Sequence, residues 1–236
     1  MRRSSFEPRR NGSSFRRGGL AMGGFVRWAP MLALSVTMLA CAPKVSLRVS
    51  PQAVAELPLE RKLTLLDAEN ALLAAADAKE AQEERVLLAA DARRAANKRI
   101  RDAEDARERD RIAKDGPAVG DAAIREAEAR KNFTEKDRDL QRELMKLAEA
   151  DYMLADAKFE QARAAEVEGA ALAGAQGVKL EDYAKQVAKL EQVRAERAAE
   201  AAKVRAKADE ARAAWDSVRG ELTRLSGGAQ GSVWVQ

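Results

Sequence analysis

The fold is decided by residues 179–226, which read KLEDYAKQVAKLEQVRAERAAEAAKVRAKADEARAAWDSVRGELTRLS. Apolar side chains recur along this stretch at alternating steps of three and four residues, and twelve of the fourteen positions in the resulting ladder are apolar. A 3.5-residue period kept for six heptads predicts a long helix that packs against a partner helix as in a coiled coil. The ladder consists of Leu180, Tyr183, Val187, Leu190, Arg194, Arg197, Ala201, Val204, Ala208, Ala211, Trp215, Val218, Leu222 and Leu225.

Two arginines, Arg194 and Arg197, interrupt this ladder and have two interpretations. Basic residues inside a seam can fix the register of two helices at a cost in stability. Their aliphatic stems can also cover the seam while the guanidinium groups reach water, and we favour this interpretation. Elsewhere in the seam, replacing Val204 with aspartate is expected to cost several kcal/mol, because the charge would be unpaired.

Glycine and proline divide the rest of the chain. No glycine occurs between 25 and 115, between 121 and 168 or between 178 and 219, and Pro117 is the last proline. Because these two residues are the main helix breakers, their clusters at 116–120 and 169–177 predict three long helices near 52–114, 121–172 and 179–226. The three prolines within 42–58 favour an extended spacer there.

The predicted helix over 52–114 carries two interleaved heptad sets. Small residues in one set let two helices approach closely, so the seam should be narrow and tight where it is apolar. The first set is Leu65, Leu72, Lys79, Val86, Arg93, Ile100 and Arg107, and the second is Ala68, Ala75, Gln82, Ala89, Ala96, Ala103 and Asp110.

The predicted middle helix has two apolar faces, which indicates that it lies between the other two helices. The sequence therefore predicts an all-α fold: an elongated antiparallel helical hairpin or three-helix coiled-coil bundle that runs up, down and up. One stripe contains Phe133, Leu140, Leu144, Leu147 and Leu154, and the other contains Met145, Ala148, Tyr152, Ala155, Phe159 and Ala162.

Two segments have a structural and a functional interpretation. Nine of the eleven residues from Arg101 to Arg111 are charged, which is typical of a solvated helix end with Asp105/Arg109 and Asp110/Lys114 pairs, or of a docking site for a charged partner. The tail over 227–236 is glycine-rich and carries Trp234, which either folds back or inserts into a partner.

Composition excludes several kinds of chemistry. The 236 residues include no histidine, one cysteine and ten aromatic side chains, so disulfide frameworks, histidine-based triads and histidine-ligated zinc are ruled out. No phosphate-binding loop, nucleophile elbow, dinucleotide fingerprint or metal-ligand spacing occurs. We therefore expect no enzymatic activity, no cofactor and no metal site.

Charge is concentrated at the N-terminus. Residues 1–40 hold seven arginines and one glutamate, so their net charge of +6 leaves −2 for the remainder. If these residues are removed, the argument for a nucleic-acid partner disappears with them, and we expect none.

Residues 28–40 form an uncharged, mostly apolar stretch after a basic segment, which is the layout of a secretory signal peptide and is too short to span a membrane. Met22 is an alternative start that would give a signal of ordinary length. Arginine pairs in the basic segment raise the twin-arginine export route, but the Ser or Thr expected before such a pair is missing at Arg16-Arg17.

Met38-Leu39-Ala40-Cys41 resembles the lipobox of bacterial lipoproteins, and Cys41 is the only cysteine in the chain. The resemblance implies that Cys41 is lipidated and becomes the mature N-terminus, and Ala42 after it implies sorting to the outer membrane. Two or three acyl chains would anchor the protein firmly, since each buried CH₂ contributes ~0.8 kcal/mol. The alternative is a plain signal peptide that ends near a cysteine.

An anchor followed by a helical rod is similar to the murein lipoprotein of Gram-negative bacteria. That protein's covalent wall link uses a C-terminal lysine, whereas this chain ends in Gln236, so contact with peptidoglycan should be non-covalent or through another protein. We expect a structural or interaction rod at the periplasmic face of the outer membrane. An accessory subunit of an export or efflux assembly is the alternative, and a homo-oligomer is open because heptads can pair within or between chains.

Overall fold

The computed structural model describes residues 44–113, 117–171 and 178–227. These residues contain helices and no strand, which confirms the all-α class. The helices are α1 (Pro51–Ala55), α2 (Leu59–Leu63), α3 (Leu66–Ala113), α4 (Pro117–Gly169) and α5 (Leu180–Leu225).

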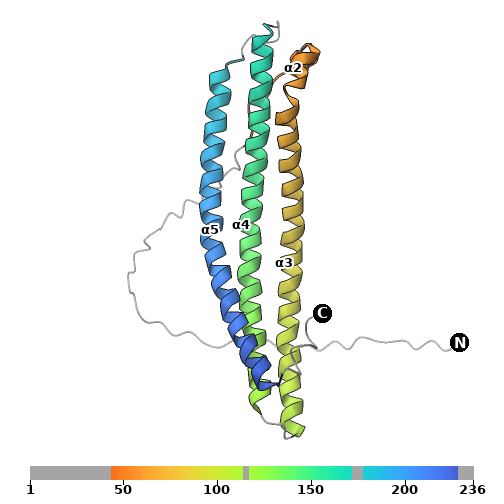
Figure 1. The fold of residues 1–236 in the computed structure, drawn as a ribbon, viewed down its shortest axis with the longest axis vertical. Coiled ribbons are helices and arrows are strands. Elements are labelled where there is room, and N and C mark those ends of the chain that lie inside the picture. The colour runs from red at the N-terminus through yellow and green to blue at the C-terminus, as the bar shows by residue number, and fades with distance from the viewer. Residues whose placement is uncertain (1–43, 114–116, 172–177, 228–236) are drawn as a thin grey trace, which may run out of the picture. The chain divides into compact units, whose positions relative to one another are not determined.

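The middle helix α4 lies between α3 and α5 and packs along both (Figure 1). Its two apolar faces contact different neighbours. Leu154 packs against Val187 and Leu190 of α5, whereas the ring of Tyr152 lies 6.0 Å from the ammonium group of Lys79 in α3. The sandwiched middle helix predicted from the two stripes is confirmed, and α4 runs antiparallel to both neighbours (Figure 1).

The buried face of α5 is the predicted ladder. Every buried residue of this helix belongs to that ladder. Arg194, one of the two arginines that interrupt the ladder, forms a contact with α4. The Arg194 side chain is 49% exposed, and its Nε donates to Asp151 Oδ1 of α4 at 2.5 Å, so its guanidinium group reaches solvent and forms an ion pair with α4. The buried residues are Tyr183, Val187, Leu190, Ala201, Ala208, Ala211 and Leu222.

Small residues lie in the contact of α3 with α4, as the heptad sets predict. Ala89 and Ala96 are both buried. Gln82, a polar member of the heptad sets, finds its partner on α4: its Nε2 donates to the backbone and side-chain oxygens of Gln141, at 3.1 and 2.9 Å. These bonds let Gln82 occupy a seam position with its amide group hydrogen-bonded.

The first predicted helix, near 52–114, is observed as three helices. Pro58 precedes α2 and disfavours the helical conformation at Leu57, which separates α1 from α2. The second break, between α2 and α3, contains Thr64, whose hydroxyl bonds to Arg61 O and Glu166 Oε1, at 2.7 and 2.9 Å. Side-chain bonds of this kind compete with the helical backbone pattern.

The second predicted helix, near 121–172, begins and ends earlier than expected. It begins at Pro117, because proline suits the first turn of a helix, where its missing N–H has no partner to lose. Gly120 lies inside the helix, where a Cβ would approach Arg107 Cγ to 3.0 Å. The helix ends at Gly169, whose carbonyl accepts a bond from Arg61 Nη2 at 3.0 Å, and Ala171 has a φ of 49°.

The predicted spacer over 42–58 also needs correction, because its described part is packed into the fold. Side chains alternate from residue 44 to residue 50, with the even-numbered ones exposed and the odd-numbered ones partly or fully buried. Val45, Leu47 and Val49 therefore face the α4–α5 pair, which is the period-two pattern of an extended chain lying on a surface. The prolines favour the extended backbone, but the apolar residues decide that it packs.

Candidate interaction surfaces

The predicted lipidation site, Cys41, lies outside the described residues, together with the leader over 1–40. In the tail over 227–236, only Gly227 is described, so Trp234 lies outside as well. Lipidation and the role of the tail stay predictions.

The N-terminal segment, residues 44–57, is held on α4 and α5 by polar contacts that sequence reasoning did not identify. Ser46 donates from both its backbone N and its Oγ to Gln186 Oε1 of α5, each at 2.9 Å. Arg48 forms a two-pronged ion pair with Asp156 of α4, with both N–O distances at 2.6 Å. A planar guanidinium that meets a carboxylate in this way fixes orientation as well as charge.

Glu160 of α4 is the centre of these contacts and is 1% exposed. Its Oε2 accepts from Val49 N at 2.8 Å, and its Oε1 accepts from Arg163 at 2.7 Å and from Arg48 at 3.3 Å. The hydrogen bond and charge of Asp156, with smaller contributions from Glu160, raise the pKa of Arg48 above its ordinary value. A buried carboxylate with three partners is a structural group that fastens the segment to α4.

A second polar cluster lies toward the opposite end of α4. Glu126, 2% exposed, accepts a hydrogen bond from Trp215 Nε1 at 2.8 Å and pairs with Arg99 Nη2 at 3.2 Å. The Trp215 ring stacks on Phe133, with ring centroids 5.4 Å apart. Burial lowers the pKa of Arg130, whose guanidinium lies 5.5 Å from the Trp215 ring. This cluster joins α3, α4 and α5, and it accounts for Trp215 as a packed residue.

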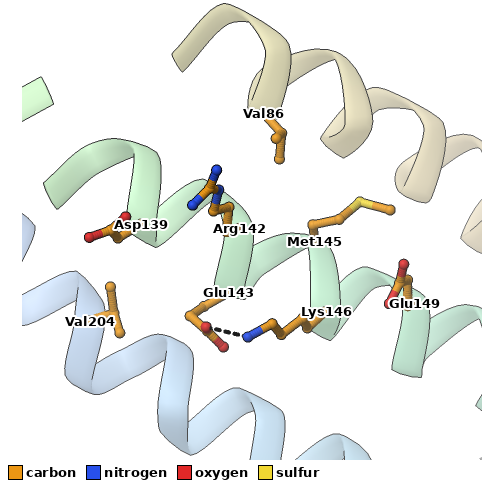
Figure 2. A pocket seen from close by; sticks show the side chains of 8 residues that line it. All are labelled: Val86, Asp139, Arg142, Glu143, Met145, Lys146, Glu149 and Val204. Atoms are coloured by element: carbon orange, nitrogen blue, oxygen red, sulfur yellow. Dashed lines mark hydrogen bonds and ion pairs between the residues drawn. The ribbon is translucent and has the colours of Figure 1, made fainter. Parts of the chain in front are cut away.

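A groove of about 680 Å³ runs over α4 between its two neighbours. Figure 2 shows Val86 of α3 and Val204 of α5 on opposite sides of the α4 residues that form its floor. The groove holds charges of both signs and one internal ion pair, Glu143 with Lys146 at 2.6 Å. Its floor residues are Asp139, Arg142, Glu143, Met145, Lys146 and Glu149, of which three are exposed.

The groove is lined by one apolar residue from each helix and by five charged residues of α4, three of which are exposed. Mixed charge with scattered apolar contacts is typical of a surface that receives a helix or remains solvated.

The surfaces of α2 and α3 that face away from α4 expose large apolar side chains. Six leucines there are 46% to 71% exposed, whereas the only described large apolar residue of α5 in this class is Leu225. The six are Leu59, Leu63, Leu66, Leu73, Leu87 and Leu88. Apolar residues at repeated positions on one helix surface are typical of a contact with another protein.

The charged run from Arg101 to Arg111 forms pairs that differ from those expected. Arg109 donates to the backbone O of Asp105 at 3.3 Å instead of pairing with its carboxylate. Arg107 pairs across the helix boundary with Asp121 of α4 at 2.7 Å, and Arg111 pairs with Glu108. The Asp110/Lys114 pair lies outside the described side chains.

Over residues 44–113, 117–171 and 178–227, no group of three or more His, Cys, Asp or Glu side chains is placed to hold a metal ion. Among the helices of these same ranges, none combines the length and the apolar character required to cross a bilayer.

Comparison with protein-family models, with curated proteins and with solved structures gives no match for this chain.

Sequence reasoning missed the N-terminal contacts for an identifiable reason. The period-two pattern of Val45, Leu47 and Val49 is present in the sequence, but the surrounding prolines favour an extended spacer as strongly as a packed strand-like segment. Nothing in the sequence marks Glu160 as buried, because it is one of many carboxylates that lie three or four residues from a basic residue. Only the fold shows that this carboxylate faces inward.

Proposed function

We propose that this chain is a lipid-anchored envelope protein of a Gram-negative bacterium, a non-catalytic interaction rod held at the periplasmic face of the outer membrane by acyl groups on Cys41. The sequence before Cys41 has the layout of a signal peptide, and Leu39-Ala40-Cys41 resembles a lipobox. The fold then presents long helical surfaces.

The observation that carries this proposal is the position of Cys41, the only cysteine in the sequence, directly after the apolar run of residues 28–40. The Val45 side chain, four residues after Cys41, lies against the α4–α5 core. Cleavage before Cys41 would remove residues 1–40 and none of the described helices. The helical body would therefore be retained after lipoprotein processing.

The short connection has a consequence for the proposed anchor. Val45 already packs on the α4–α5 pair, so only Ala42, Pro43 and Lys44 would separate the acylated residue from packed side chains. Such an anchor would be a short tether and not a long spacer. It would hold this end of the body close to the membrane.

Metabolic labelling with a palmitate analogue, combined with membrane fractionation, tests the proposal. The wild-type chain should be labelled and should sediment with outer membranes, whereas Cys41→Ser should remain an unlabelled precursor. A matched control, Cys41→Ser with Ser50→Cys, returns a thiol nine residues later and should also stay unlabelled. Label on the Cys41→Ser chain, or a mature N-terminal peptide without fatty acid, would contradict the proposal.

Crosslinking in cells followed by purification separates the two roles that the sequence leaves open. Peptidoglycan-binding proteins among the crosslinked partners support the structural rod. A transport channel among them supports instead an accessory subunit of an export assembly.

A further inference from the structure

One row of side chains on α3 faces away from α4. Its members follow one another at alternating steps of four and three residues, so they form a single line along the helix. All are exposed, while the buried seam of the same helix, with Gln82, Ala89 and Ala96, packs on α4. The row, called the outer row below, is Leu73, Asp77, Glu80, Glu84, Leu87, Asp91, Arg94, Lys98 and Arg101.

Charge is segregated along the outer row. An acidic block, Asp77, Glu80 and Glu84, precedes Leu87, and a basic block follows it. In the basic block, Arg94 pairs with Asp91 of its own helix. The other five charges of the two blocks form no ion pair with the described residues. Like charges at three- and four-residue spacing repel one another, so a structural reason for the segregation should lie outside the chain.

The two blocks are mirror images in their spacing. The acidic residues are separated by three and then four positions, and the basic residues by four and then three, with position 89 midway between the blocks. When one copy of α3 is turned end for end against another at the level of this position, each residue of the acidic block meets a residue of the basic block. Asp77 faces Arg101 of the partner copy, Glu80 faces Lys98 of the partner copy, and Glu84 faces Arg94 of the partner copy.

We propose that α3 is the interface of an antiparallel dimer of this chain, with a two-fold axis near position 89. The two-fold axis doubles the three pairings to six, and an isologous contact closes after two copies. Parallel helices in register would place acid against acid and base against base. Complementary charges of this kind set the orientation of paired helices more than they set affinity.

Apolar residues lie where the axis passes. Leu87 and Leu88 are 67% and 59% exposed, and the axis brings the two copies of each within ~6 Å of one another along the helix direction. Ala81 and Ala95, exposed one heptad to either side of Leu88, are small enough for the helices to approach closely. The interface thus has an apolar centre flanked by ion pairs.

Charge reversal in the full-length chain tests the pairing. Analytical ultracentrifugation should find the wild type dimeric, whereas Asp77→Lys/Glu80→Lys/Glu84→Lys and Arg94→Glu/Lys98→Glu/Arg101→Glu should each raise the dimer dissociation constant at least about tenfold. An equimolar mixture of the two variants should recover the dimer. Reversal of Asp209 and Glu210, exposed on α5, is the matched control and should change nothing.

Cysteine crosslinking tests the direction of the helices in the Cys41→Ser background. A cysteine at Leu87 should crosslink to its own copy through a short bis-maleimide, whereas one at Asp77 should not, because two copies of position 77 would lie ~36 Å apart. Cysteines at Asp77 and Arg101 should crosslink to each other when two singly substituted chains are mixed. A monomeric wild type, dimers that tolerate both reversals, or crosslinking between positions 77 and 94 instead of 101 would each overturn the proposal.

Discussion

Glu160 shows how much one buried carboxylate can decide. It is almost fully buried, and its oxygens connect α4 to the backbone of Val49 and to two guanidinium groups. A charge in this position is tolerated because every oxygen has partners; removing them would leave the charge unpaired. The residue fixes where the N-terminal segment lies, and it also affects the neighbouring Tyr183.

Tyr183 makes the stability of this end depend on pH. Burial raises the pKa of Tyr183 above its ordinary value of 10.0, and the negative charge of Glu160 acts in the same direction. The folded chain therefore holds the phenol proton more tightly than the unfolded chain does. The resulting stabilisation is complete below the unfolded pKa and is lost as the pH rises through the higher folded pKa.

We therefore expect the free energy of unfolding to fall above about pH 10, and to fall less in Tyr183→Phe, which has no phenol to ionise. Urea unfolding followed by circular dichroism at about pH 9 and about pH 11 measures both losses. Because the comparison is between two chains with the same lysines and arginines, the titration of those groups cancels. Equal losses in the two chains would contradict the assignment to Tyr183.

At the scale of the helix, periodicity indicates which face is buried but not how deeply each position is buried. Leu190 and Val204 are equivalent rungs of the α5 ladder in the sequence. In the structure Leu190 is 2% exposed and packs against Leu154, while Val204 borders the open groove on α4 (Figure 2). The expected cost of a charge therefore differs between them.

Leu190→Asp should destabilise the fold by ~3–5 kcal/mol, because the carboxylate would be buried among apolar side chains. Val204→Asp should cost less, on the order of 1–2 kcal/mol, because its carboxylate can reach water in the groove although Glu143 repels it. Urea unfolding of both variants measures the difference. Equal costs would mean that the groove is closed in solution.

The three long helices could be predicted from the sequence because each carries a long apolar repeat. Their ends could not, because the decisive groups come from elsewhere in the chain. Arg61 of α2 belongs to no sequence pattern that marks a helix end, yet its side chain donates a hydrogen bond to Gly169 O at the end of α4. Gly120 does not break α4. It lies inside this helix, at the point where Arg107 of α3 comes close to its backbone. The candidate surfaces were predicted less well still, since exposure depends on which helices lie side by side.

At the scale of the whole described body, α3 and α5 each pack on α4, and there is no single core that all three share along their length. One end differs, because the N-terminal segment, Leu65 just before α3, and residues of α4 and α5 meet there in one apolar cluster. Its buried members are Val49, Ala53, Leu57, Leu65, Ala164, Val167 and Tyr183. An extended body of this kind should open locally, with different free energies at its two ends.

Hydrogen exchange on a Val49→Asp variant tests this local behaviour. The aspartate would place a charge in the shared cluster next to the buried Glu160, so the amides of α4 near Val167 and of α5 near Tyr183 should exchange at least about tenfold faster. Amides near Glu126, in the polar cluster toward the other end, should keep their protection, because their contacts with Trp215 do not involve the N-terminal segment.

Leu59→Asp is the matched control, since Leu59 is 71% exposed and the charge remains in water. This variant should leave exchange unchanged at both ends. Faster exchange at both ends of the Val49→Asp body would mean that the helices open as one cooperative unit, and the two ends would then share one stability. Faster exchange confined to the end near Val49 would instead agree with the observed contacts, because the residues that hold the N-terminal segment are not those that hold the Glu126 cluster.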